Sequence, residues 1–458
     1  MSHSILILCP DVIGERMAGP AIRYWEFAKA LVTDHVVTLA VPNEIPEALQ
    51  QTTSFSLVQH TPENIAELVS HHDIILFQGY IFDHYPQLRQ SDKILVADLY
   101  DPIPLEGLEQ LKNQVAAETL PQIADQVRMM TDQVKWADYF LCANSRQRDL
   151  WLGYLLALGR INSFNYENIK QRMVIVPFGL PDEAPQRTGT GFRKPFEIDE
   201  SKFVLLWGGG IWEWFDPLTL IQVIHRLLPR YPDLRLIFLG TQHPNPTIPT
   251  MPMQHRAESL ARELELYGKQ VIFQPGWVPY ETLQNHLLDA NVGVNAHFDT
   301  LETHFSFRTR ILPYLWAGKP IITTEGDILA DEIAHMKAGI VIKPKDESAW
   351  IDAIEKLHDP DNYANYLLGV KKLAQHYCWS TVIQPLRVLC ANPSRSPDLI
   401  IEPGCRKSLN WDCEQAYNAL KFQLFERETQ LETIENSNSM RLTASLRALR
   451  RWMTHWKT

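Results

Sequence analysis

The stretch at residues 292–327 constrains the fold more than any other part of the sequence. Its first five residues, 292–296, form a short apolar run that predicts a buried parallel strand. A polar loop follows, and a helix is predicted to begin at Ser306, a favourable N-cap residue, and to end at Gly318. A further strand is predicted to begin at Ile321. Strand, loop, helix and strand in this order form the repeating unit of an open α/β sheet.

The loop in this stretch is expected to hold an anion. It lies at the carboxyl end of a strand and at a helix N-terminus, where ligands bind in open α/β sheets. Free backbone N–H groups and the helix dipole favour negative charge there. Arg308 and Arg310 fall in the first turns of the predicted helix and add forked guanidinium donors. The sequence predicts a phosphate-binding corner, and the alternative is an ordinary helix with two solvated arginines.

Composition indicates a globular protein of two or three domains in a reducing compartment. The chain has 458 residues, 45% of them hydrophobic, and its formal net charge of −11 argues against a surface built for nucleic acid. The six cysteines form no regular framework, and Cys9 and Cys142 lie in apolar runs, which predicts buried thiols and a cytoplasmic location. The sequence shows no signal-peptide pattern and no apolar stretch of about 18 residues that would span a membrane.

The first half of the chain alternates strands with helical patterns. A buried strand at residues 5–9 leads into a loop with Gly14 and Gly19, and a helix is predicted to follow as far as Val32. This order is typical of a nucleotide-binding α/β unit, although the GxGxxG fingerprint is absent. The alternation predicts a doubly wound parallel sheet. Its further strands are predicted at residues 36–41, 74–77, 94–97, 139–143 and 174–177.

Polar residues follow two of these strands. Asp98 and Asp101 come directly after the strand at 94–97, and Asn144 follows the strand at 139–143. Carboxylates at the carboxyl edge of a sheet are suited to act as a base, as an electrostatic stabiliser or as acceptors for sugar hydroxyls. The alternative is that Asp101 caps the next segment while Asp98 accepts loop N–H bonds. We interpret the pair as functional.

The second half repeats the pattern after a segment rich in Pro and Gly. A strand at residues 203–207 runs into Gly208, Gly209 and Gly210, and three glycines allow a close approach of the backbone to a ligand. Further strands are predicted at 234–240, from 271 and at 340–342. The predicted domains are residues 1–180 and 181–390.

Several of these segments resemble GT-B glycosyltransferases of the GT4 type. The run Ala317-Gly-Lys-Pro-Ile321 is similar to the end of the family's donor-site motif, and Pro177-Phe-Gly-Leu-Pro181 resembles its interdomain crossover. Of the family's two glutamates, separated by seven residues, neither is at its expected position: Phe305 and Pro313 stand there, and Glu302 is the nearest acid. Pro313 is also expected to kink the predicted helix.

The glycine loop also departs from the family pattern. The Arg and Lys that the family uses for the donor diphosphate are absent, and Trp212, Glu213 and Trp214 follow the glycines instead. Either the loop binds phosphate through backbone N–H groups alone, or Arg308 and Arg310 supply the charge. The tryptophans alternatively cover the core.

The resemblance implies two Rossmann-like doubly wound domains that face a cleft, the first for an acceptor and the second for a nucleotide-diphosphate sugar. It implies glycosyl transfer, with retention, to a cell-surface glycan or lipid-linked acceptor. No metal or other cofactor is expected, because cationic side chains and helix dipoles stabilise the leaving group in this fold. The candidate residues are Asp98 and Asp101 for catalysis; Gly209, Gly210, Gly276, Trp277, Val278, Glu302, Arg308, Arg310, Glu325 and Asp327 for the donor; and Arg16, Gly19, Arg23 and Asn144 for the acceptor.

Residues 391–458 are predicted to form a linker and a helical, basic tail. Apolar residues recur at helical spacing among arginines and lysines at residues 440–458. Such a helix lies on an anionic membrane surface or packs on a partner protein, and both readings stay open. The first would place the chain on the inner face of a membrane. The apolar residues are Leu442, Leu446, Leu449, Met453 and Trp456.

Two other functions stay open beside glycosyl transfer. A sugar-nucleotide epimerase of the same fold needs catalytic acids and a histidine in the cleft. A catalytically silent nucleotide-sugar-binding or scaffold protein is the other alternative, because the glutamate pair and the glycine-loop cations are missing. Release of free nucleotide that requires an acceptor distinguishes a transferase from both.

Overall fold

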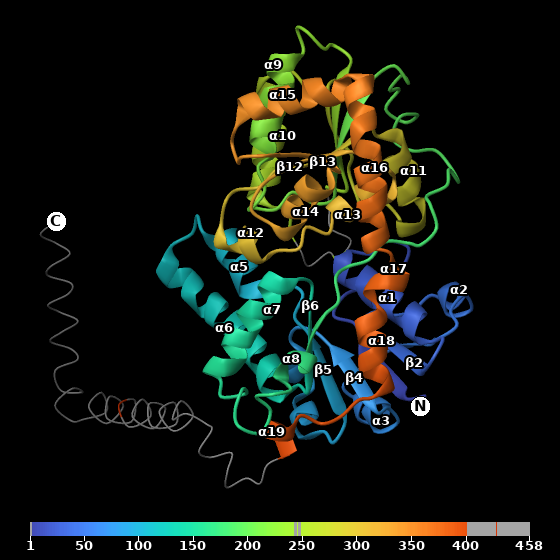
Figure 1. The fold of residues 1–458 in the computed structure, drawn as a ribbon, viewed down its shortest axis with the longest axis vertical. Coiled ribbons are helices and arrows are strands. Elements are labelled where there is room, and N and C mark those ends of the chain that lie inside the picture. Colours follow the sequence, from blue (N-terminus) through green and yellow to red (C-terminus); the bar gives the residue numbers. More distant parts are fainter. Residues whose placement is uncertain (1, 242–244, 246–248, 401–426, 428–458) are drawn as a thin grey trace, which may run out of the picture. The chain divides into compact units, whose positions relative to one another are not determined.

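The computed structural model describes residues 2–241, 245, 249–400 and 427. Two parallel β-sheets, one in each half of the chain, form its framework (Figure 1). The amphipathic tail predicted at residues 440–458 lies outside the described residues. No helix in the described part of the chain combines the length and the apolar character needed to cross a membrane.

The first sheet has seven parallel strands. They are β1 (Ser4–Leu8), β2 (Val36–Val41), β3 (Ser56–Gln59), β4 (Ile74–Phe77), β5 (Ile94–Asp98), β6 (Tyr139–Cys142) and β7 (Met173–Ile175). Their order in space is β3-β2-β1-β4-β5-β6-β7, so the direction of winding reverses between β1 and β4. In open α/β sheets, ligands bind in the crevice at the carboxyl ends of the strands at such a reversal.

The second sheet has six parallel strands and the same kind of reversal. They are β8 (Phe203–Gly208), β9 (Leu234–Leu239), β10 (Val271–Phe273), β11 (Val292–Asn295), β12 (Ile321–Thr324) and β13 (Gly339–Ile342). Their order is β10-β9-β8-β11-β12-β13, so the winding reverses between β8 and β11. The predicted α/β class with two doubly wound parallel sheets is confirmed.

Helices connect the strands in both halves (Figure 1). The first half contains α1 (Gly19–Leu31), α2 (Glu47–Gln50), α3 (Ile65–Ser70), α4 (Ile81–His84), α5 (Ile103–Leu111), α6 (Ala116–Trp136), α7 (Ser145–Ala157) and α8 (Ile169–Arg172), with a 3₁₀ turn at Pro86–Gln90. The second contains α9 (Pro217–Leu227), α10 (Pro252–Glu263), α11 (Leu283–Asp289), α12 (Leu301–Phe305), α13 (Ile311–Trp316), α14 (Ile328–Met336), α15 (Glu347–His358) and α16 (Pro360–His376), with a 3₁₀ turn at Tyr280–Thr282. Three short helices follow: α17 (Trp379–Val382), α18 (Gln384–Ala391) and α19 (Pro397–Ile400).

Successive residues of the strands face opposite sides of the second sheet, as the pleat of a strand requires. Leu205 and Trp207 of β8 belong to a core with residues of α9, α10 and α15. Val204 and Leu206 belong to a core with residues of α11, α13, α14 and α16. Helices therefore cover both faces, which explains why β8 reads as a continuous apolar run.

Helices α17 and α18 return to the first half of the chain. The Trp379 ring lies 6.0 Å from that of Phe27 on α1 and 5.4 Å from that of Phe178. Arg387 of α18 donates to the carbonyl oxygen of Ala30 at 2.8 Å. Helices α17 and α18 thus pack on elements formed about 350 residues earlier.

The segment after α18 is more ordered than the predicted linker. Arg172 Nη1 donates to the carbonyl oxygen of Ser394 at 2.9 Å, and the Ser396 amide donates to Asp138 Oδ1 at 2.7 Å. Ser396 is fully buried. Residues 394–396 therefore belong to the packed structure of the first half, and the prediction of a linker from residue 391 is wrong for this part.

A buried ion pair joins α1 to the end of β5. Arg23 donates to both carboxylate oxygens of Asp98, at 2.7 and 3.0 Å, and both side chains are 0% exposed. The same guanidinium donates to the carbonyl oxygens of Val176 and Pro177, where the chain leaves the first sheet. Asp98 and Arg23 were predicted to serve catalysis and the acceptor, but their polar atoms are used within the fold.

We expect Asp98→Asn to lower stability strongly, because it leaves the Arg23 charge buried without a counter-ion. Breaking one side of such a pair costs about 3–5 kcal/mol. Urea denaturation followed by circular dichroism measures the change. The matched control is Asp34→Asn, because Asp34 is 53% exposed and lies 3.5 Å from Arg387. The control should change stability by less than about 1 kcal/mol, and equal losses in the two variants would contradict the assignment.

Candidate active site

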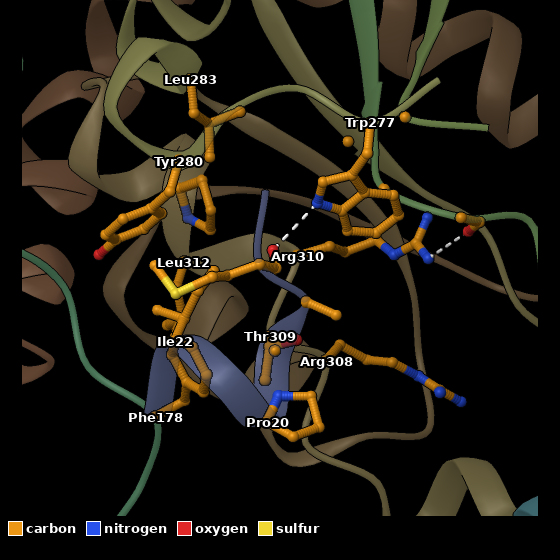
Figure 2. Close-up of a pocket in the computed structure, with 18 of the residues that line it drawn as sticks. Pro20, Ile22, Phe178, Trp277, Tyr280, Leu283, Arg308, Thr309, Arg310 and Leu312 are labelled. Atoms are coloured by element: carbon orange, nitrogen blue, oxygen red, sulfur yellow. Dashed lines mark hydrogen bonds between the residues drawn. The ribbon is translucent and has the colours of Figure 1, made fainter. Parts of the chain in front are cut away.

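A cavity of about 1550 Å³ is lined by residues from both halves of the chain. The first half contributes the start of α1 and the segment after β5. The second half contributes the loops after β8, β9 and β10 and the turn that leads into α13 (Figure 2). The cavity therefore lies at the carboxyl end of β8, one of the two strands between which the winding of the second sheet reverses.

The glycine loop after β8 brings bare backbone to the cavity wall. Gly209 has φ of +94° and Gly240, after β9, has φ of +77°, a region that favours glycine. A Cβ atom on Gly240 would lie 3.8 Å from the Gly209 Cα and 3.5 Å from the Trp277 ring, so these three residues meet closely. The Gly208 amide donates to the Tyr314 hydroxyl at 2.6 Å, which ties the loop to α13.

The segment before α13 differs from the predicted single helix. Helix α12 ends at Phe305 and α13 begins at Ile311, so Ser306 follows one helix rather than capping the next. Thr300 is the residue that caps α12, through a bond from the Thr303 amide. The helix breaks ahead of Pro313, which lies in the first turn of α13, where an amide hydrogen is not needed. The predicted kink is thus replaced by a turn at residues 306–310.

Arg308 in this turn is neutralised by an acid of α12. Its guanidinium donates to both oxygens of Glu302, at 2.8 and 2.6 Å, and to Thr303 Oγ1 at 3.0 Å. Arg308 is 5% exposed and Glu302 is 1% exposed. Arg308 still lies in the cavity wall, whereas Glu302 lies behind it. The pair holds the turn closed, and its net charge is zero.

Arg310 differs from Arg308 because its charge is not balanced. Its Nη2 donates to the Gly210 carbonyl oxygen at 2.7 Å (Figure 2), and its guanidinium lies 3.8 Å from the centre of the Phe215 ring. No described residue forms an ion pair with it or a hydrogen bond with Nη1. Burial lowers the pKa of Arg310 to about 9, so the group stays charged at neutral pH. An uncompensated cation beside the glycine loop is suited to bind an anion.

The acids of the first half that line the cavity include Asp101 and Glu106. Burial, with a smaller contribution from the Asp98 charge, raises the pKa of Asp101 to about 6, although hydrogen bonds from Tyr100 and Gln78 act against this. Burial and the Asp101 charge raise the pKa of Glu106 well above its usual range. A carboxyl group with a pKa of about 6 is mostly ionised at neutral pH and is able to accept a proton there.

No sequence pattern singled out Glu106, or Gln147, whose side-chain amide donates to carbonyl oxygens in both halves of the chain. Glu106 lies in the first turn of α5, where an acid is commonly explained by the helix dipole alone. Gln147 lies in the first turn of α7, three residues after Asn144. The only signal for either residue is its closeness to a polar strand end, which does not reveal a contact across the cleft.

The remaining predicted residues divide into two groups by position. Gly19, Gly209, Gly210, Trp277 and Val278 line the cavity. Their predicted roles stay predictions. Trp277 also joins the two halves, since its Nε1 donates to the Met17 carbonyl oxygen at 3.0 Å (Figure 2).

The second group lies outside the cavity wall. Asp327 is fully buried, caps α14 and accepts a bond of 2.9 Å from His297 Nε2. Asn144 is buried and donates to the Ser306 carbonyl oxygen. The polar atoms of both are used within the fold, so the structure does not support their predicted donor and acceptor roles. The other residues of this group are Arg16, Arg23, Asp98, Gly276, Glu302 and Glu325.

In the described part of the chain, no group of three or more His, Cys, Asp or Glu side chains is placed to hold a metal ion. The four described cysteines are free thiols, and Cys9 and Cys142 are buried as predicted.

Comparison with known proteins identifies the second half of the chain most clearly. Residues 202–359 match the family model described as glycosyl transferases group 1. A relative, D-inositol 3-phosphate glycosyltransferase from Corynebacterium urealyticum, is 25% identical over 243 residues, which are 51% of this chain and 55% of the relative. The chain thus aligns with little more than half of that relative's length.

Two solved structures resemble nearly the whole described chain. Sucrose-phosphate synthase from Thermosynechococcus elongatus aligns with a TM-score of 0.57 and 17% identity, over 84% of this chain and 97% of the other. HepE from Anabaena, in complex with UDP-glucose, aligns with a TM-score of 0.59 and 12% identity, over 85% of this chain and all of the other.

These solved structures share the two-sheet architecture described above, which confirms the predicted GT-B fold. The match to the glycosyl transferases group 1 model covers residues 202–359, that is, most of the second half of the chain. This segment contains the glycine loop and both arginines of the cavity.

We expect Arg308→Met to destabilise the turn, because Glu302 remains buried without its partner. The cost of such a broken pair is about 3–5 kcal/mol. Adding Glu302→Met should recover most of the loss, since two apolar side chains then replace two charges. Urea denaturation of the two single variants and the double variant measures the coupling. Additive losses would contradict a closed, mutually neutralising pair.

Proposed function

We propose that this chain transfers a sugar from a UDP-sugar to a glycan or lipid-linked acceptor, with retention at the anomeric carbon. The observation that carries the proposal is Arg310, an uncompensated cation next to three glycines in the cavity. The negative charge of a nucleoside diphosphate would balance the positive charge of Arg310. The group 1 match of the same segment supports the proposal.

The donor would lie along the second sheet. Its diphosphate is assigned to the Gly208–Gly210 loop and Arg310, which stabilise the charge that develops on the leaving UDP. The base is assigned to the wall at Trp277 and Val278. The choice of UDP rests on HepE, a structural neighbour whose complex contains UDP-glucose.

The acceptor would enter along the first half. Asp101 is assigned as the base that accepts the proton of the acceptor hydroxyl, because it lines the cavity and its pKa lies near neutral pH. The glycan or lipid nature of the acceptor and the retention of configuration rest on the GT4 resemblance. Proton NMR of the product's anomeric centre tests retention.

Calorimetry against UDP-, GDP-, dTDP- and ADP-sugars tests the donor, and UDP release with and without acceptor candidates tests transfer. The proposal expects a UDP-sugar to bind and an acceptor to accelerate UDP release. Conversion of one UDP-sugar into another without an acceptor would favour an epimerase. Binding without turnover over a broad acceptor panel would favour a silent binding protein.

We expect Arg310→Met to weaken the binding of UDP by about 30- to 150-fold, the loss of about 2–3 kcal/mol expected for a charged hydrogen bond. Met keeps the apolar contact with Phe215, so the variant should stay folded. Calorimetry with UDP measures the change. The matched control is Arg226→Met, on α9 outside the cavity, where Arg226 pairs with Glu347 at 2.7 Å. Equal affinity in the Arg310 variant and the wild type would contradict the diphosphate assignment.

We expect UDP release to depend on pH through Asp101. A base must be ionised, and its raised pKa of about 6 keeps Asp101 protonated below that pH. The kcat/KM for UDP-glucose should therefore rise through about pH 6 and level off above it. Asp101→Asn should remove this rise and lower kcat by about 100-fold or more. Glu109→Gln, outside the cavity on α5, serves as the control. If kcat/KM instead fell as the pH rises through 6, Asp101 would act as a general acid and not as a base.

A further inference from the structure

Gln147 connects the two sides of the cavity through one amide group. The residue lies in the first turn of α7 and is 0% exposed. Its Nε2 donates to the carbonyl oxygen of Tyr100 at 2.7 Å and to that of Phe305 at 2.9 Å. Its Oε1 accepts from the Ala143 amide at 2.7 Å. Both amide hydrogens are used, one in the first half of the chain and one in the second.

The two carbonyl groups belong to the segments that the proposed chemistry must align. Tyr100 directly precedes Asp101, the proposed base. Phe305 ends α12, directly before the turn that contains Arg308 and Arg310. The donors of a primary amide have a fixed geometry, so the bonds of Gln147 set the spacing between the two segments.

Two side chains near Gln147, one in α7 and one directly before it, make contacts of the same kind. Arg146 Nη1 donates to the Gly326 carbonyl oxygen at 2.6 Å, and its Nη2 pairs with Asp331 at 2.5 Å. Asn144 Nδ2 donates to the Ser306 carbonyl oxygen at 3.4 Å. Arg146 is partly exposed, whereas Gln147 is completely enclosed. Gln147 is therefore the contact least weakened by competition with water.

We propose that Gln147 is a positioning residue that sets the place of the Asp101 segment relative to the donor turn. This inference rests on the proposed function. Rates of group transfer are sensitive to such placement, and a shift of about 1 Å can cost about 100-fold. Gln147 touches neither the glycine loop nor Arg310, so it affects the alignment of the reactants rather than the affinity for UDP.

The test compares UDP binding with turnover in Gln147→Met, which keeps the volume and loses all three hydrogen bonds. We expect the Kd for UDP to stay within about twofold, while kcat for UDP release from UDP-glucose falls about 10- to 100-fold. Gln147→Glu is the second variant. It keeps the acceptor for the Ala143 amide but faces two carbonyl oxygens without a donor, and it should lose kcat at least as strongly.

The matched control is Gln133→Met on α6. Gln133 is also 0% exposed, and its Oε1 accepts from the Gly79 amide at 3.0 Å. Its Nε2 donates to the sulfur atoms of Met129 and Met130, so its contacts stay within the first half. This control should lower the urea midpoint without changing kcat by more than about twofold, because it does not connect the two sides.

Three results overturn the inference while leaving the proposed function intact. One is a wild-type kcat in folded Gln147→Met. The second is an equal fall of kcat in the Gln133 control, and the third is a loss of UDP affinity that matches the loss of kcat. If Gln147→Met does not fold, the same comparison in Gln147→Glu and Arg146→Met decides. A wild-type chain that neither binds UDP nor turns over a UDP-sugar overturns the proposed function itself.

Discussion

The buried ion pair of Arg308 and Glu302 determines the shape of the turn on which the cleft depends. A guanidinium that is 5% exposed requires a carboxylate close by, and Glu302 lies six residues earlier in the chain. The pair therefore closes residues 302–308 into a compact loop. This closure turns the carbonyl groups of residues 304–306 toward α7 and brings Arg310 to the glycine loop. The contacts across the cleft and the charge in the cavity both follow from it.

The two arginines of the turn differ in how their charges are balanced. Arg308 stabilises the turn, and the negative charge of Glu302 balances its positive charge. Arg310 stacks on Phe215 and lacks a counter-ion among the described residues. Holding a cation partly out of water costs free energy. The negative charge of the proposed diphosphate would offset that cost.

Sequence patterns predicted most strands because parallel strands covered by helices on both faces read as apolar runs. They failed at β3, where only Leu57 is buried. The glycine loop and both arginines were found because they adjoin a strand end and a helix start. The Arg23–Asp98 pair was misread, since its partners are 75 residues apart and no local signal relates them. Gln147 was missed for the same reason, because its importance lies in contacts with two distant carbonyl groups.

Because α17 and α18 return to the first half, the packing of the first half is completed late during synthesis. Phe27 and Phe178 pack against Trp379, and Ala30 accepts a bond from Arg387. Trp379 and Arg387 leave the ribosome only after the whole second sheet has been made. At about 5–20 residues per second, the interval of about 200 residues lasts roughly 10–40 seconds. During that time Phe27 of α1 and Phe178 lack the Trp379 ring that packs on them, so the nascent chain exposes apolar side chains that the finished molecule hides.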